Sequence, residues 1–153
     1  MGPAGGVMAE LLIPRRKYND NIKAGTMKYG ISKTTGLSYE HAINRVTEEL
    51  KKEGFGILTT IDVKETMKKK LNLDFPKYVI LGACNPPFAY QALQAEEELG
   101  LFLPCNVIVY EKEGKTTIAI FDPMVLTKIL EKTTIAGIIQ EMKTRLERVI
   151  AAV

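Results

Sequence analysis

The first half of the chain alternates between strand-like and helical hydrophobic patterns. A strand is expected at about residues 27–31, followed by a helix whose apolar face includes Val46 and Leu50. Ser38 is placed to cap the start of this helix, and Gly54 is placed to end it. The pattern therefore predicts one strand and one amphipathic helix in this part of the chain.

A second strand and a short helix follow. Apolar or β-branched side chains occupy every second position of residues 55–63, which predicts a strand with Phe55, Ile57 and Ile61 on one side. Residues 64–71 are expected to form a short helix. Its three consecutive lysines are more typical of a solvated face than of an anion site.

The second half of the chain predicts a buried strand, a proline-opened helix, a β-hairpin and a long final helix. Their expected ranges are residues 78–84, 86–100, 105–112 with 115–122, and 134–151. The hairpin turn is placed at Glu113-Gly114, because turn residues there are flanked by alternating hydrophobic positions.

This order of elements, β-α-β-(α)-β-α-β-β-α, predicts an α+β fold with a mostly antiparallel sheet and helices packed on one face. A length of 153 residues fits one domain, which is assigned to residues 27–153. Residues 1–26 show no regular period and are expected to form a flexible or loosely docked extension. The second face of the sheet also needs cover, and this predicts a homodimer.

Composition and charge narrow the classes of function. The chain is 46% hydrophobic and 25% charged with a net charge of +3, and its basic residues are dispersed among acidic ones. This argues against a nucleic-acid partner, which requires a concentrated basic face. No apolar run approaches the ~20 residues of a membrane span, and no signal peptide is evident. A cytoplasmic protein with no membrane or nucleic-acid partner is expected, and abundant Lys and Glu lean towards a thermophile.

Two Cys-Asn steps are the most informative motifs. Cys84-Asn85-Pro86 ends the buried strand and opens a helix, and Cys105-Asn106 opens the hairpin; the chain has no other cysteine. Side chains at such junctions are held by rigid elements, and binding groups are often placed there. All five residues are therefore candidate ligand-binding residues.

The chemistry of these residues stays open at this point. Cys84 precedes a helix, whose dipole would lower the thiol pKa and favour a redox, nucleophilic or soft-metal role. The alternative is a small buried hydrophobic side chain. If the strand that ends at Cys84 and the strand that begins at Cys105 are neighbours, both thiols would lie at the same end of the sheet. They could then form a disulfide, bind a metal or simply pack together. No CxxC or third ligand accompanies the thiols, so no metal site is predicted.

The amides and the single histidine also have two interpretations. Asn85 and Asn106 either cap backbone or line one shared pocket. His41 lies opposite the apolar face of its helix, which argues against a Cys-His or Ser-His-Asp site. Two functions remain: binding of a small ligand or protein partner near the Cys-Asn motifs, or thiol-based redox or soft-metal handling by Cys84 and Cys105. Catalytic residues and cofactors are not assigned.

These motifs resemble the domain of unknown function 302 family over about residues 27–150. The residues that carry the resemblance are Phe75-Pro76-Lys77-Tyr78, Leu81-Gly82-Ala83-Cys84-Asn85-Pro86, Leu103-Pro104-Cys105-Asn106-Val107 and Asp122-Pro123. The resemblance implies a TBP-like α+β fold with a curved antiparallel sheet, and a homodimer. It implies no established activity, and fold analogy with TBP does not license DNA binding.

Overall fold

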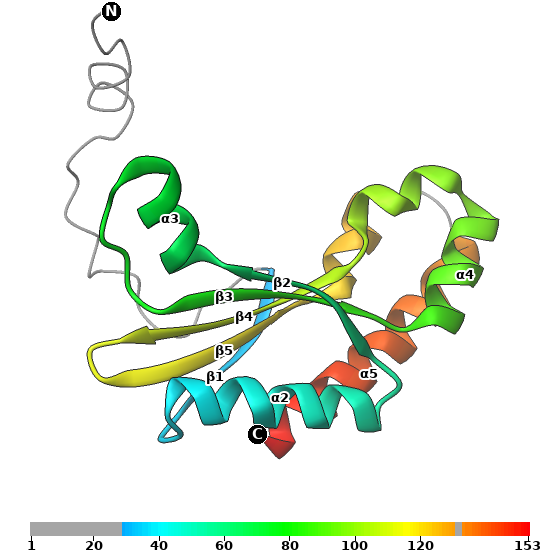
Figure 1. Ribbon diagram of the computed structural model, residues 1–153. Helices are drawn as coiled ribbons and strands as arrows, with labels where there is room; N and C mark the ends of the chain where they lie inside the picture. Colours follow the sequence, from blue (N-terminus) through cyan, green and yellow to red (C-terminus); the bar gives the residue numbers. More distant parts are fainter. Residues whose placement is uncertain (1–28, 131–132) are drawn as a thin grey trace, which may run out of the picture.

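The computed structural model describes residues 29–130 and 133–153, which form one open sheet with helices packed against it (Figure 1). The strands are β1 (Gly30–Thr35), β2 (Gly56–Asp62), β3 (Tyr78–Cys84), β4 (Cys105–Lys112) and β5 (Lys115–Phe121). The helices are α2 (Tyr39–Lys52), α3 (Val63–Leu71), α4 (Pro86–Ala95) and α5 (Ala136–Ala152), with 3₁₀ helices η1 (Glu97–Phe102), η2 (Pro123–Lys128) and η3 (Thr133–Ile135). The predicted extension, residues 1–26, lies outside the described residues.

The sheet has five strands in the order β1-β5-β4-β3-β2, and every neighbouring pair is antiparallel. This confirms the predicted α+β class and the mostly antiparallel sheet. The likeness to TBP stays a prediction.

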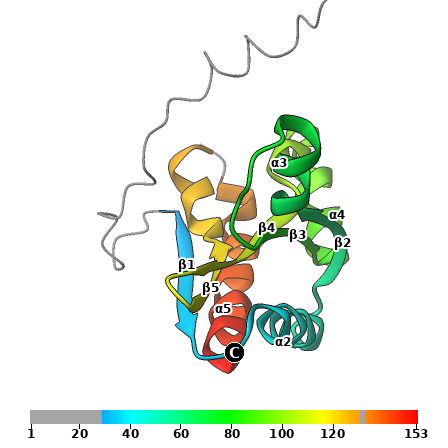
Figure 2. The ribbon, with the colours of Figure 1, turned by 60° about the vertical axis from the view of Figure 1, so that its left-hand side comes forward.

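Helices α2 and α5 lie side by side against one face of the sheet (Figures 1 and 2). The hydrophobic core lies between these two helices and the sheet. Its main side chains come from alternate positions of the three central strands and from both helices: Val46, Leu50, Val79, Leu81, Val107, Val109, Ile118, Ile120, Leu146 and Val149. Helix α3 stands on the other side of the sheet from α2 and contributes no buried residue (Figure 1). The packed helices therefore cover one face, as predicted.

Local signals for the ends of α2 and for the hairpin are confirmed. The Ser38 hydroxyl accepts a hydrogen bond of 3.2 Å from the His41 backbone N–H, and Gly54 follows the helix with φ of +85°. In the hairpin turn, Glu113 and Gly114 have φ of 51° and 74°. Two positive φ values in a two-residue loop are typical of a type I′ turn, which matches the twist of the flanking strands.

Strand β2 departs from the predicted alternation. Ile57 lies opposite Ala83 on the core face, whereas Ile61 lies opposite Ile80 on the other face. The register shifts between these pairs at a β-bulge, where Leu58 is the extra residue. The prediction that Phe55, Ile57 and Ile61 share one side was wrong, because one inserted residue exchanges the two faces of a strand.

Candidate functional site

The two Cys-Asn motifs meet at one end of the sheet. Cys84 is the last residue of β3, Cys105 is the first residue of β4, and the two strands are antiparallel neighbours. Ala83 lies directly opposite Cys105. The expectation that neighbouring strands would bring both cysteines to the same end of the sheet is confirmed.

A small apolar cavity of about 40 Å³ lies at this end of the sheet. Helix α4, the 3₁₀ helices and the first turns of α5 surround that end (Figure 1). The lining includes both cysteines, Asn85 and apolar side chains from all these elements: Phe88, Ala92, Leu99, Phe102, Phe121, Leu126, Ile138, Ile139 and Met142. One water needs roughly 10–15 Å³, so the cavity has room for about three water-sized groups.

Burial keeps both thiols protonated. Cys84 is half-buried and Cys105 is 5% exposed, and both are free cysteines. Burial raises the pKa of Cys84; burial, with a smaller effect of Cys84, raises the pKa of Cys105 to about 11. In the part of the chain that the structure describes, no charged side chain lines the cavity to stabilise a thiolate. The hypothesis that the dipole of α4 lowers the Cys84 pKa was therefore wrong, because desolvation dominates.

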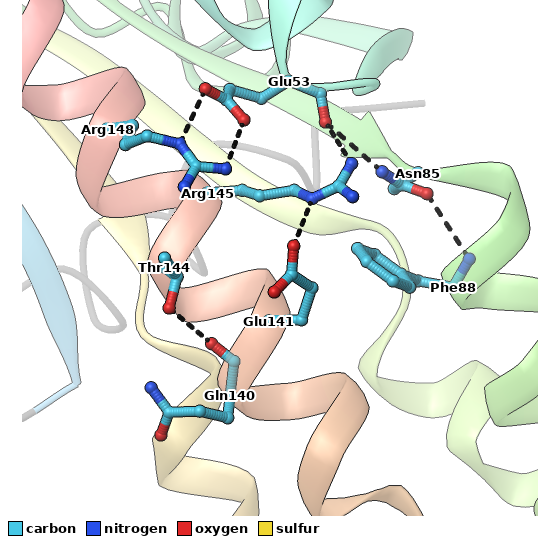
Figure 3. Close-up of polar contacts among 8 residues, drawn as sticks. All are labelled: Glu53, Asn85, Phe88, Gln140, Glu141, Thr144, Arg145 and Arg148. Atoms are coloured by element: carbon cyan, nitrogen blue, oxygen red, sulfur yellow. Dashed lines mark hydrogen bonds and ion pairs between the residues drawn. The ribbon is translucent and has the colours of Figure 1, made fainter.

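Asn85 serves the fold as a helix cap (Figure 3). Its side-chain Oδ1 accepts a hydrogen bond of 3.4 Å from the Phe88 N–H, and its Nδ2 donates to the Glu53 carbonyl at 3.4 Å. The side chain is buried, and the amide lines the cavity while it holds these two partners. The capping interpretation of Asn85 is confirmed.

A polar network joins this cap to α2 and α5 (Figure 3). Arg145 Nη1 donates to the Glu53 carbonyl at 3.1 Å, and the Arg145 guanidinium lies 5.0 Å from the Phe88 ring centroid. Arg148 donates two hydrogen bonds of 2.9 Å to the Glu53 carboxylate and lowers its pKa. The network ties the C-terminal end of α2 and the N-terminal end of α4 to the second half of α5. Sequence reasoning missed it, because the partners Glu53 and Arg145 are 92 positions apart.

Asn106 lies outside the cavity. Consecutive strand residues point to opposite faces, so the buried Cys105 side chain leaves Asn106 on the other face of β4, opposite Gly82. There Asn106 lines a surface groove of about 230 Å³. The interpretation in which both amides line a single pocket is not supported, because Asn85 lines the cavity and Asn106 lines the groove. Pro86 is exposed at the first position of α4.

The remaining candidate features concern the histidine, metal-ion sites and membrane-spanning helices, in the part of the chain that the structure describes. His41 is exposed, as predicted from its position on α2. No group of three or more His, Cys, Asp or Glu side chains is placed to hold a metal ion within residues 29–130 and 133–153. Among the helices described, none is long and apolar enough to span a membrane.

Comparison with known proteins identifies the family. Residues 31–153 match the profile of the Domain of unknown function DUF302. The chain belongs to this family. The crystal structure of an uncharacterized conserved DUF302 protein from Bacillus stearothermophilus superimposes with a TM-score of 0.76 at 31% identity, covering 82% of this chain and 98% of that one. No curated protein matches the chain.

Membership of DUF302 confirms the resemblance that the Cys-Asn motifs indicated. The description of the family names no activity. The function of this DUF302 chain therefore has to be argued from its own site.

Proposed function

We propose that this DUF302 chain is a binding module that takes a small apolar group into the cavity between Cys84 and Cys105. The observation that supports the proposal is the lining: apolar side chains, two protonated thiols and one amide that already has two partners. Apolar cavities stay dry and accept apolar guests. Among the described residues, no carboxylate, histidine or lysine that could act as a general base lines the cavity, which favours binding over catalysis.

Titration with 1-butanol, followed by methyl NMR, tests this proposal. We expect saturable shifts of the Ile139 and Met142 methyl signals, which report on the cavity. Ala92→Leu fills part of the cavity and is expected to weaken binding at least tenfold, since each buried methylene contributes about 0.8 kcal/mol. Ala95→Leu is the matched control, because Ala95 is exposed on the same helix. Equal binding by both variants would contradict the proposal.

Thiol-based redox or soft-metal handling is the second candidate, favoured by the position of both thiols on one cavity. The raised pKa values argue against it, because the thiolate is the nucleophile and the metal ligand.

Alkylation by iodoacetamide separates the two candidates. At pH 7.5 we expect native Cys105 to react about a hundredfold more slowly than in the unfolded chain, since two pKa units reduce the thiolate hundredfold. The stability contributed by the buried, protonated thiol is fully present below the ordinary thiol pKa and is lost as the pH rises towards 11. A fast-reacting Cys84, or a disulfide in unreduced protein, would support thiol chemistry instead.

We also propose that the chain is a homodimer. Most paired positions on the sheet face away from α2 and α5 carry uncharged side chains, and the exception is Lys112 opposite Lys115 at the hairpin end. The uncharged positions include Ser32, Thr34, Thr59, Ile61, Tyr78, Ile80, Ile108, Tyr110, Thr117 and Ala119. The rings of Tyr78 and Tyr110 stack at 5.6 Å between centroids. A second copy related by a twofold axis offers the same face, on which the Lys112–Lys115 pair is the one charged pair among the paired positions of the described strands.

Native mass spectrometry checks the dimer. The wild-type chain is expected at twice the monomer mass of 17.0 kDa. Ile108→Glu places a charge at the centre of this face and is expected to give monomers. Thr34→Glu places a charge at an exposed position of β1 on the same face and is expected to have the same effect. Tyr90→Glu, on the exposed side of α4, is expected to stay dimeric. A monomeric wild type would refute the dimer.

A further inference from the structure

The cavity and the surface groove share a wall. Phe102, Leu103 and Phe121 line both the cavity of about 40 Å³ and the groove of about 230 Å³. All three side chains are half-buried. These shared side chains therefore separate the cavity, with its half-buried Cys84 and buried Cys105, from a groove that is open to solvent.

The other described residues that line the groove are apolar or neutral and polar. It consists of Leu101, which is 83% exposed, with Pro104 and Asn106. The Asn106 amide bonds to no other side chain in the described part of the chain, so its donors and acceptor are available. The groove thus combines apolar walls with one neutral hydrogen-bonding group, a combination typical of small-molecule sites.

We propose that groove and cavity form one channel for a neutral straight-chain amphiphile. The tip of the chain enters the cavity past Phe102, Leu103 and Phe121, and the hydrogen-bonding head lies beside Asn106. This inference rests on the proposed function and names its ligand class. It brings the Cys105 and Asn106 side chains to opposite ends of one site, although they lie on opposite faces of β4.

Size and charge both select this ligand class. The cavity holds only about three small groups, whereas ligand sites typically span about 300–1,000 Å³, so most of the ligand has to lie in the groove. An uncharged head is selected, because no charged side chain among the residues that the structure describes lines the cavity or the groove and would pair with an ion. The part of the ligand that enters the cavity has to be narrow, because the cavity holds only about three small groups.

Methyl NMR with 1-octanol tests the channel and separates it from the proposed function. Ile139 reports on the cavity alone and Leu101 on the groove alone. Saturable shifts of both signals at one equivalent support the channel, with affinity rising about fourfold per buried methylene from 1-butanol. Shifts of Ile139 alone overturn the channel and leave the proposed function standing. Shifts of Leu101 alone, or of neither, overturn both.

Two pairs of variants sharpen the test. Asn106→Leu is expected to weaken 1-octanol binding about two- to tenfold, the range for one hydrogen bond, whereas the exposed Asn44→Leu on α2 leaves it unchanged. Phe102→Leu thins the shared wall and is expected to speed 1-octanol association, whereas the exposed Tyr90→Leu does not. Equal effects within either pair would overturn the assignment of the head or of the wall.

Discussion

Leu99→Ala is expected to lower the free energy of unfolding by about 2–5 kcal/mol, the range for removing a buried leucine side chain. Leu99 is 4% exposed, is the one buried residue of η1 and packs against Ile135 and Ile139 beside the cavity. Leu101→Ala is the matched control in the same 3₁₀ helix, because its side chain is 83% exposed. Urea unfolding should place the control within about 0.5 kcal/mol of the wild type.

The same substitution also tests the binding proposal. Leu99 lines the cavity, so Leu99→Ala enlarges it. Enlarged apolar cavities bind benzene. Benzene should therefore raise the thermal midpoint of Leu99→Ala and leave Leu101→Ala unchanged. A Leu99→Ala variant that loses no more stability than Leu101→Ala would mean that η1 does not wall the cavity.

Gly82→Ala is expected to lower the free energy of unfolding by about 1–3 kcal/mol, the usual range for overpacking. A Cβ atom at this position would overlap Thr59 Oγ1 and lie 2.8 Å from Pro104 Cγ. Thr59 is exposed and able to rotate away, whereas the Pro104 ring is fixed to the backbone that opens β4. The strain should therefore fall mainly on Pro104, which lines the groove.

The matched control for this effect is Gly56→Ala in β2, where an added Cβ meets nothing within 4 Å. Chemical denaturation should show it unchanged or slightly more stable, since alanine restricts the unfolded chain. Thr59→Ala in the Gly82→Ala background should recover only a minor part of the loss. Full recovery would show that Thr59, not Pro104, carries the strain, and equal losses at Gly82 and Gly56 would contradict the close approach altogether.

Features with local causes were predictable from the sequence. The cap at Ser38, the helix end at Gly54 and the type I′ turn at Glu113-Gly114 depend only on neighbouring residues. The family resemblance also followed from short motifs and is confirmed by the match to DUF302. The α+β class followed from the order of these local elements.

Features with distant causes were not predictable. The bulge at Leu58 exchanges the faces of β2 without a sequence signal, and the Glu53–Arg145 contact joins residues 92 positions apart. By contrast, the opposite orientation of Cys105 and Asn106 has a local cause, strand alternation, and it was missed although the hairpin prediction implied it. The raised thiol pKa values depend on how deeply packing buries the end of the sheet, which no single motif reveals.

Xenon pressurisation of crystals of the protein tests the central claim most directly, because xenon enters dry apolar cavities without hydrogen bonding. We expect one xenon atom in the cavity lined by Cys84, Cys105 and Ile139 in the wild type, and lower occupancy in Ala92→Leu. Ordered water in this cavity, or xenon bound only elsewhere, would contradict a site for apolar groups between the two Cys-Asn motifs.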